Sequence, residues 1–363
     1  MYNKGQEELV IMRLEVTIPN ILLMILTTFL FSVLLVPLFK KVAFHIKALD
    51  YPNKRRLNKV PMPTIGGLAV FFSFLLGYMI FGRGTVEMLS VIIASFVILL
   101  VGLIDDINPI SAKYQLLGQL AAIFIIIFYG NLTIDNMTIL GASFNFPAPL
   151  NYLVTTIFML GIINAIDLSD GMDGLCGGIS TIYFITITAI ALLLNMAGNI
   201  DSTISILMIG SLLGFLVYNF PPAKIYLGDT GSNFVGLMIA TTALYSFKVA
   251  TVTSLIVPLL ILATPIIDVF FAIIRRSLKK QNPFTNPDKE HLHHQLLKMK
   301  FSTKTSLLVI YLINFAFSFA TILYTLGDFD LALPLYVALM VIFLFVVLKT
   351  NILFERKKKN HAE

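Results

Sequence analysis

Long hydrophobic runs alternate with short polar breaks along almost the whole chain. Each run is close to the roughly 20 residues that a helix needs to cross the hydrocarbon core of a bilayer. We predict about eleven spans, at approximately 18–39, 64–81, 88–104, 114–130, 151–167, 177–197, 203–219, 232–247, 251–273, 304–325 and 331–353. The pattern therefore predicts an all-α polytopic integral membrane protein.

The basic residues in the polar breaks indicate which side of the membrane each break occupies. Lys and Arg concentrate around 40–59, in 274–304 and in the C-terminal tail, whereas 131–150 contains neither. Because positively charged loops stay in the cytoplasm, we predict the basic breaks and the C-terminus inside and 131–150 outside. An odd number of spans then places the N-terminus outside, although Lys4 and Arg13 mildly oppose this.

Two other features complete the predicted architecture. Apolar and polar residues alternate in 131–146, which predicts a small extracellular β-hairpin. No A-x-A-like cleavage site follows the first span, so we expect an uncleaved helix. The chain then forms a single transmembrane domain over 1–363, with a polar head at 1–17, a cytoplasmic loop at 274–304 and a basic tail at 354–363.

The composition excludes several classes of protein. With 57% hydrophobic and 13% charged residues, the chain does not fit a soluble globular protein. The net charge of +6 comes from basic residues in short breaks between spans, so it does not indicate nucleic-acid binding. Cys176 is the one cysteine, which excludes an intrachain disulfide and a cysteine metal site.

Acidic residues gather at the predicted cytoplasmic ends of the spans. A carboxylate near the bilayer core costs roughly 2.5–3.5 kcal/mol on insertion scales, so each one is a candidate for function. The candidates are Asp105, Asp106, Asp167, Asp170, Asp173, Asp229 and Asp268. Separate parts of the chain contribute them to one predicted face, together with the histidine cluster in 288–294. Carboxylates, histidines and lysines at one face indicate metal-dependent chemistry on a phosphate.

Asp105 and Asp106 end one predicted span, and Asp229 begins another. Adjacent helical residues point about 100° apart, so we expect one of the aspartate pair to face the site and the other to position it. Their mutual repulsion could raise the pKa of one of them, which suits a general base. Asp229 fits a Mg²⁺ ligand, because Mg²⁺ takes one or two carboxylates plus phosphate oxygens. It also fits a helix N-cap.

Asn164, Asp167, Asp170 and Asp173 recur at three-residue intervals. This spacing drifts around an α-helix, so the four side chains converge only if the helix ends or tightens there. The glycines that follow allow such an ending and offer backbone N–H groups to a phosphate. The alternative is a plain polar turn between two spans.

Two loops carry further candidates for binding an anionic substrate. The run DKEHLHH at 288–294 contains His291, His293 and His294. Zinc is conceivable there, but an anionic substrate fits better because Arg275 and Arg276 belong to the same loop. A solvated loop is the alternative. Asp268 could pair with a basic residue or line the site, and the segment from Lys59 could be a phosphate-binding loop or a plain connection.

Five motifs, in this order, resemble the polyprenyl-phosphate N-acetylhexosamine-1-phosphate transferases of glycosyltransferase family 4. They are PTIGG at 63–67, GLIDD at 102–106, NAIDLSDGMDGL at 164–175, NFPPAKIYLGDTGS at 219–232 and DKEHLHH at 288–294. The resemblance covers nearly the whole chain. It implies transfer of N-acetylglucosamine 1-phosphate from UDP-N-acetylglucosamine to undecaprenyl phosphate, with release of UMP. It also implies a Mg²⁺ or Mn²⁺ cofactor and the cytoplasmic face of a bacterial plasma membrane, at the first membrane step of a cell-wall glycan such as teichoic acid.

The resemblance also implies roles for individual residues. Asp105 and Asp106 would be catalytic, and Asp229 and Asp173 would be metal ligands. The substrate-binding candidates are Lys59, Asn164, Asp167, Asp170, Asn219, Lys224, Asp268, His291, His293 and His294. Two positions depart from the family's usual pattern: Asp167 stands in place of an asparagine and Asn58 in place of a histidine.

Other functions stay open from the sequence. The His-x-His-His spacing at 291–294 favours N-acetylglucosamine over a muramyl-pentapeptide donor, whose branch typically shows three consecutive histidines. An ion-coupled transporter also needs membrane carboxylates, but it predicts them near the middle of the bilayer and often shows internal repeats, and no repeat is evident here. Besides the substrates and the lipid bilayer, a homodimer is a candidate partner.

Overall fold

The computed structural model describes residues 17–52, 60–139, 142–249, 256–278 and 292–349. Its helices are α1 (Ile18–Ile46), α2 (Gly66–Phe81), α3 (Val86–Ile107), α4 (Ala112–Phe124), η1 (Ile125–Tyr129), α5 (Leu150–Leu168), α6 (Leu175–Leu193), α7 (Ile200–Asn219), α8 (Gly228–Val249), α9 (Ile256–Ile261), α10 (Ala263–Leu278), α11 (Leu292–Lys298), α12 (Thr303–Thr325) and α13 (Phe329–Lys349). In the described ranges, seven helices are long and apolar enough to cross a membrane, counting α4 and η1 together. The polytopic helical architecture is therefore confirmed, and the number of spans stays a prediction.

Most predicted spans correspond to one helix each, but the span predicted at 251–273 does not. Its described part is divided into α9 and α10, which are separated at Leu262. Pro265 explains the division, because it has no N–H to bond the carbonyl of Ile261 and its ring clashes with that carbonyl.

Two short antiparallel strand pairs lie among the helices. Strand β1 (Leu49–Asp50) pairs with β2 (Met62–Pro63), just before α2. Strand β3 (Asn136–Ile139) pairs with β4 (Ala142–Asn145), inside the segment where alternation predicts a hairpin. The position of β3 and β4 outside the membrane stays a prediction.

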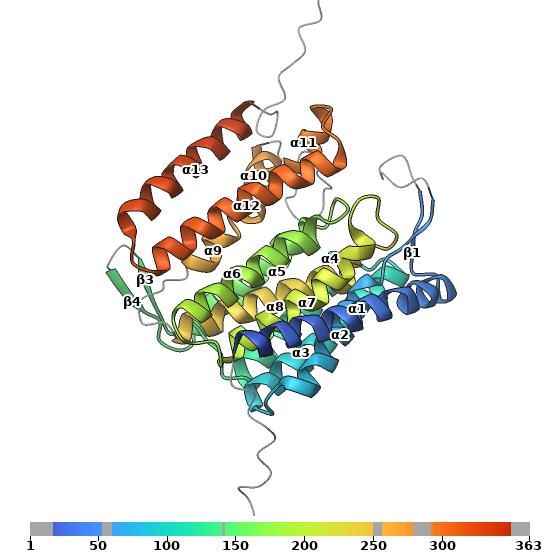
Figure 1. Cartoon of the computed structure of the whole chain (residues 1–363), viewed down its shortest axis with the longest axis horizontal. Helices are drawn as coiled ribbons and strands as arrows, with labels where there is room; N and C mark the ends of the chain where they lie inside the picture. Colours follow the sequence, from blue (N-terminus) through green and yellow to red (C-terminus); the bar gives the residue numbers. More distant parts are fainter. Residues whose placement is uncertain (1–16, 53–59, 140–141, 250–255, 279–291, 350–363) are drawn as a thin grey trace, which may run out of the picture.

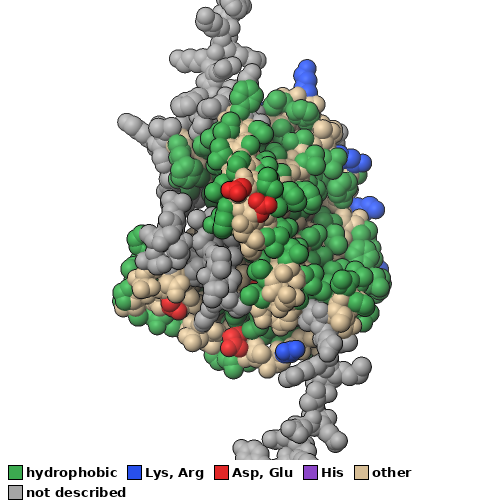
Figure 2. All heavy atoms as spheres, turned by 60° about the vertical axis from the view of Figure 1, so that its left-hand side comes forward, with side chains coloured by type: hydrophobic (Ala, Val, Ile, Leu, Met, Phe, Trp, Pro, Cys, Tyr) green, Lys and Arg blue, Asp and Glu red, His purple; other side chains and the backbone are tan. Residues whose placement is uncertain are grey.

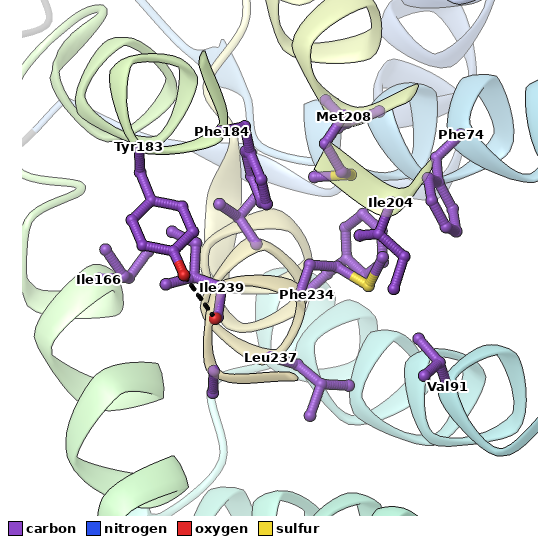
Figure 3. Packing of buried hydrophobic residues seen from close by; sticks show 14 of the residues in the cluster. Phe74, Val91, Ile166, Tyr183, Phe184, Ile204, Met208, Phe234, Leu237 and Ile239 are labelled. Carbon is purple, nitrogen blue, oxygen red and sulfur yellow. Dashed lines mark hydrogen bonds between the residues drawn. The ribbon is translucent and has the colours of Figure 1, made fainter. Parts of the chain in front are cut away.

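Helix α8 lies at the centre of the bundle, where it contacts α2, α3, α5, α6 and α7 (Figure 1). Its apolar side chains are buried on all sides, as expected for a helix enclosed by others. Figure 3 shows Phe234, Leu237 and Ile239 of α8 surrounded by Phe74, Val91, Ile166, Tyr183, Phe184, Ile204 and Met208. The Tyr183 hydroxyl also donates a hydrogen bond to the Ile239 carbonyl at 3.3 Å. Close packing holds such a bundle together, because lipid offers helices no hydrophobic driving force to associate.

The outer surface of the bundle is strongly apolar. Large side chains such as Leu34, Phe128 and Leu312 are more than 60% exposed. Figure 2 shows one face, covered mainly by hydrophobic side chains with few charged ones. Such a surface fits contact with lipid tails rather than with water.

The long helices run alternately up and down, so each end of the bundle collects particular helix termini. Hydrogen bonds join the end of α3 to the start of α8, and the start of α6 to the end of α7. We call the end of the bundle where these four helix termini lie the acidic end, because the candidate aspartates lie there. The opposite end contains the starts of α1, α3 and α7 and the ends of α2 and α8.

Candidate active site

The carboxylate of Asp106, at the end of α3, caps the first turn of α8. Its oxygens accept hydrogen bonds from the backbone N–H groups of Asp229 (3.2 Å) and Thr230 (3.0 Å) and from the Thr230 hydroxyl (2.5 Å). The first N–H groups of a helix have no partner within the helix, and a negative charge there also favours the helix dipole. Asp106 therefore fixes the start of α8, and with it the position of Asp229.

Two glycines make this junction possible. Gly102 lies one helical turn before Asp106 on α3, and a Cβ there would come within 2.6 Å of the backbone of Asp229 and Thr230. Gly228 has φ +74°, and a Cβ on it would come within 2.7 Å of both carboxylate oxygens of Asp106. The GLIDD and LGDTG motifs thus bring two helix backbones into direct contact.

Asp105 and Asp229 form a carboxylate pair beside this junction. Their side chains lie within hydrogen-bonding range of one another. Asp105 also accepts from the backbone N–H of Ile110 at 2.7 Å, and Asp229 accepts from the side chain of Gln115 at 3.2 Å. The charged groups that act on Asp229 are the aspartates at 105, 106 and 167. Adjacent carboxylates repel each other unless a proton or a cation lies between them.

A chain of polar side chains leads from this pair into the bundle. Gln119 donates to Asn233 at 2.8 Å and accepts from Asn164 at 3.0 Å. Asn233 donates in turn to Asp167 at 3.1 Å, and Ser232 also donates to Asp167. The network connects α4, α5 and α8, so it sets how these three helices sit at the acidic end.

The loop between α5 and α6 is anchored to the segment before α8. Asp173 accepts from the backbone N–H of Ala223, and Asn219 accepts from that of Gly174, both at 2.9 Å. Asn219 is buried and donates to the Ile225 carbonyl at 2.8 Å. Both the oxygen and the nitrogen of its side-chain amide therefore have hydrogen-bond partners within the protein.

Asp170 lies in the same loop, close to other carboxylates. Burial, together with the charges of Asp167, Asp106 and Asp173, raises the pKa of Asp170 to about 8, although an N–H bond from Gly228 lowers it. Near neutral pH, Asp170 therefore carries a proton much of the time, and a nearby cation would favour its ionised form.

The PTIGG segment packs against the chain that leads into α8. The N–H groups of Gly66 and Gly67 donate to the carbonyls of Tyr226 (3.0 Å) and Leu227 (2.9 Å). Their amides are therefore used to hold α2 against α8, and this part of the segment is a structural connection. Lys59, which precedes it, lies outside the described residues.

Helices α10 and α11 lie beside the α5–α6 loop. Asp268 of α10 accepts from the backbone N–H of Leu292 at 3.0 Å, at the start of α11. A small cavity of about 20 Å³ is lined by both residues and by Ser169, the neighbour of Asp170. His294 is half-buried in α11 and Lys224 is exposed. His291 and the side chain of His293 lie outside the described residues.

The structure thus brings together carboxylates that are far apart in the chain, such as those of Asp105 and Asp229, which are 124 residues apart. Sequence reasoning identified the aspartates but missed Gln115, Gln119, Thr230, Ser232 and Asn233. The two glutamines lie four residues apart on α4, and Asp229 and Asn233 lie four apart on α8, so each pair shares one helix face. Polar residues four positions apart, on helices that otherwise bury apolar side chains, were the signal for this shared face in the sequence.

Replacing Gln119 by Met is expected to lower the free energy of unfolding by about 1–3 kcal/mol, because the buried Asn233 loses the donor to its side-chain oxygen. Thermal unfolding of the purified protein in detergent or nanodiscs measures the effect. Tyr114→Phe on the exposed face of α4 is the matched control and should leave the unfolding temperature unchanged. Equal unfolding temperatures for the two variants would show that the network adds nothing to stability.

The oxygen donors at the acidic end fit a hard divalent cation. The part of the chain that is described contains no cluster of three or more His, Cys, Asp or Glu side chains arranged to hold a metal ion. A cation at this end would therefore need ligands from water or substrate in addition to the protein. The Asp105–Asp229 pair supplies two carboxylates, and Mg²⁺ takes one or two, completing its shell with water and substrate phosphate. The pair therefore fits Mg²⁺ held jointly with a phosphate substrate.

The chain is similar to several known proteins. The model of the family "Glycosyl transferase family 4" matches residues 88–247, which include the α3–α8 junction. The chain is 36% identical over 343 residues, 94% of each chain, to a Bacillus subtilis (strain 168) protein named probable undecaprenyl-phosphate N-acetylglucosaminyl 1-phosphate transferase. It is 33% identical over 300 residues, 75% of each chain, to the decaprenyl-phosphate N-acetylglucosaminephosphotransferase of Mycobacterium leprae (strain TN). The undecaprenyl-phosphate alpha-N-acetylglucosaminyl 1-phosphate transferase of Escherichia coli (strain K12) is 27% identical over 297 residues, 79% of each chain.

Proposed function

The chain belongs to glycosyl transferase family 4, and from this premise we propose that it transfers N-acetylglucosamine 1-phosphate from UDP-N-acetylglucosamine to undecaprenyl phosphate. The names of all three relatives support the sugar phosphate, and those of the Bacillus subtilis and Escherichia coli relatives support undecaprenyl phosphate as the carrier. The observation that carries the proposal is the convergence of carboxylates from α3, α5, the α5–α6 loop and α8 at one end of an apolar bundle.

The reaction is a phosphoryl transfer between two anions. An oxygen of the lipid phosphate attacks the phosphorus that bears the sugar. The bond from that phosphorus to the bridging oxygen breaks, and UMP leaves with the electron pair. A phosphate monoester has its second pKa near 6, so most of the lipid phosphate is already a dianion at pH 7. Such a transfer depends mainly on positioning and charge neutralisation.

The contacts support separate roles for the two aspartates of the GLIDD motif. The hydrogen bonds of Asp106 all go to the start of α8, so we assign it a positioning role. Asp105 lies against Asp229, so we assign these two to the reacting phosphates and to Mg²⁺ or Mn²⁺. When bound, the ion would neutralise charge on the two phosphate groups. Asp173 holds the backbone of Ala223, which supports a positioning role in place of the expected role as a metal ligand.

The histidine motif bears on the identity of the donor. The His-x-His-His spacing at 291–294 favours N-acetylglucosamine over a muramyl-pentapeptide donor, in line with the names of the relatives. Helix α11 lies beside the acidic end, where His294 could approach a bound sugar nucleotide. We place the product at the start of a cell-wall glycan such as teichoic acid. A homodimer stays a prediction.

A UMP exchange assay separates this enzyme from the transporter alternative. Purified protein with undecaprenyl phosphate, unlabelled UDP-N-acetylglucosamine and Mg²⁺ should move label from added UMP into UDP-N-acetylglucosamine, because the transfer is reversible between two phosphoanhydrides. The control reaction omits the lipid phosphate and should show no exchange. Ion-driven flux in vesicles, with no exchange of UMP, would support a transporter instead.

We place the acidic end at the cytoplasmic face of the bacterial plasma membrane, with about eleven spans and the β3–β4 pair outside. The basic residues of 274–304 and of the tail support this orientation. A reporter fused after Glu363 is therefore expected to be active only if it is a type that works in the cytoplasm. Activity of a reporter that works only outside the cell would reverse the orientation and separate the acidic end from the cytoplasmic UDP-sugar.

A further inference from the structure

A cavity of about 310 Å³ opens at the end of the bundle opposite the acidic end. The starts of α1, α3 and α7, the end of α2 and the later part of α8 form its walls. Asp201 lines the cavity at the start of α7, whereas Asn219 ends the same helix beside the α5–α6 loop. Eighteen helical steps separate the two residues, which is roughly 27 Å. The cavity is therefore separate from the proposed catalytic site.

Two buried polar groups line this cavity without a full set of partners. Asp201 is 6% exposed; its Oδ2 accepts from the Ser246 hydroxyl at 2.7 Å and its carboxylate lies near the backbone N–H of Ser202, but its Oδ1 has no other hydrogen-bond partner among the described residues. Tyr245 is 8% exposed, and its hydroxyl also lacks a partner within the described ranges. Buried polar groups in proteins are nearly always satisfied, so these two call for an explanation, and a ligand in the adjoining cavity that reaches them would supply their partners.

The remaining lining is of mixed character. Arg83, which is exposed, is the one basic residue of the lining. Met24, Phe81 and Met88 provide apolar wall, and Thr85 and Thr203 provide hydroxyl groups. The cavity thus combines a buried acid, an exposed base and an apolar wall, which together match a small molecule that carries both charges.

We propose that this cavity binds a compact zwitterion, whose ammonium group donates to Asp201 and Tyr245 and whose anionic group meets Arg83. A metal ion fits less well, because a hard cation wants several oxygen ligands at short distance and the lining offers one carboxylate in a large space. The volume lies at the lower end of the range for small-molecule pockets. Ethanolamine phosphate has this chemistry, either free in solution or as the headgroup of an aminophospholipid.

The experiment uses full-length protein in nanodiscs made only of phosphatidylglycerol. In one arm, free phosphoethanolamine is titrated; in the other, phosphatidylethanolamine replaces part of the lipid. A bound ligand raises the unfolding temperature, and the shift grows with ligand concentration. We expect a shift of several degrees in at least one arm. A shift in the first arm identifies a soluble ligand, and a shift confined to the second identifies a lipid headgroup.

Variants decide whether the shift comes from this cavity. Asp201→Asn should abolish it while UMP exchange stays at the wild-type level, because the cavity is remote from the reaction. Asp330→Asn, which changes an exposed acid on α13, should retain the full shift. If Asp201→Asn does not fold, Tyr245→Phe and Arg83→Gln replace it, and each should weaken binding at least severalfold. No shift in either arm, or an undiminished shift in the cavity variants, overturns the proposal.

Discussion

Asp229→Asn is expected to lower the rate of UMP exchange by roughly a thousandfold or more, equivalent to about 4 kcal/mol of barrier. Asn keeps the size of the side chain and can still accept the bond from Gln115, so α8 should keep its place. The variant removes one of the two adjacent carboxylates that fit Mg²⁺. Because two anionic phosphates must approach each other, loss of a cation ligand is costly for this reaction.

The measurement is UMP exchange by purified variants across a range of Mg²⁺ concentrations. Asp330→Asn is the matched control, since it makes the same change at an exposed position on α13, and it should keep wild-type activity. Unchanged thermal unfolding of Asp229→Asn would show that the loss is not a folding defect. Near-normal exchange by Asp229→Asn at low Mg²⁺ would contradict the assignment of Asp229 to the metal.

Asp106→Ala is expected to affect both activity and stability. The change leaves the N–H groups of Asp229 and Thr230 without their acceptor at the start of α8. An unsatisfied buried donor costs about 1–3 kcal/mol, so the free energy of unfolding should fall by about this amount. Asp229 would also lose its fixed position, and a misplaced group of this kind can cost on the order of a hundredfold in rate.

Thr230→Val serves as the comparison for Asp106→Ala. It removes only the hydroxyl bond to Asp106 and leaves both backbone bonds, so it should cost about 0.5–1.5 kcal/mol of stability. Its exchange rate should fall by less than that of Asp106→Ala. If Asp106→Ala loses activity while unfolding at the wild-type temperature, Asp106 acts on the substrate directly and the positioning role is wrong.

The helices were predictable because the signal for a span is strong. About 20 apolar residues between polar breaks leave few alternatives, and most predicted spans correspond to one helix. The division of the ninth span was missed, since hydropathy does not register the backbone bond that Pro265 removes. The sequence itself contained that signal in the position of the proline.

The aspartates of the site were predictable for a different reason. Carboxylates are costly in an apolar bundle, so each one at the edge of a span stands out in the sequence. What each carboxylate contacts depends on which helices lie side by side, and no single stretch of sequence contains that information. Asp105 and Asp106 are adjacent in sequence, yet one lies against Asp229 and the other caps α8.

Neutral polar residues were the least predictable part of the site. Gln119 and Asn233 are buried and join three helices, but amide side chains are common enough to pass unnoticed. The cavity at the opposite end could not be predicted from the sequence either. Asp201 is an acidic residue in the first turn of a helix, which is a common position for such a residue. Its burial and unsatisfied oxygen emerge only when α7 and α8 are placed together.

The most direct test of the central claim follows the phosphorus atoms of the donor. Purified protein, undecaprenyl phosphate and Mg²⁺ are incubated with UDP-N-acetylglucosamine labelled at the phosphorus that bears the sugar, and lipid and water-soluble products are separated. The account predicts that the label moves into the lipid fraction with the sugar and that unlabelled UMP is released in equal amount. Label that stays in a soluble nucleotide while the sugar alone joins the lipid would contradict it, as would transfer only from a UDP-muramyl-pentapeptide donor.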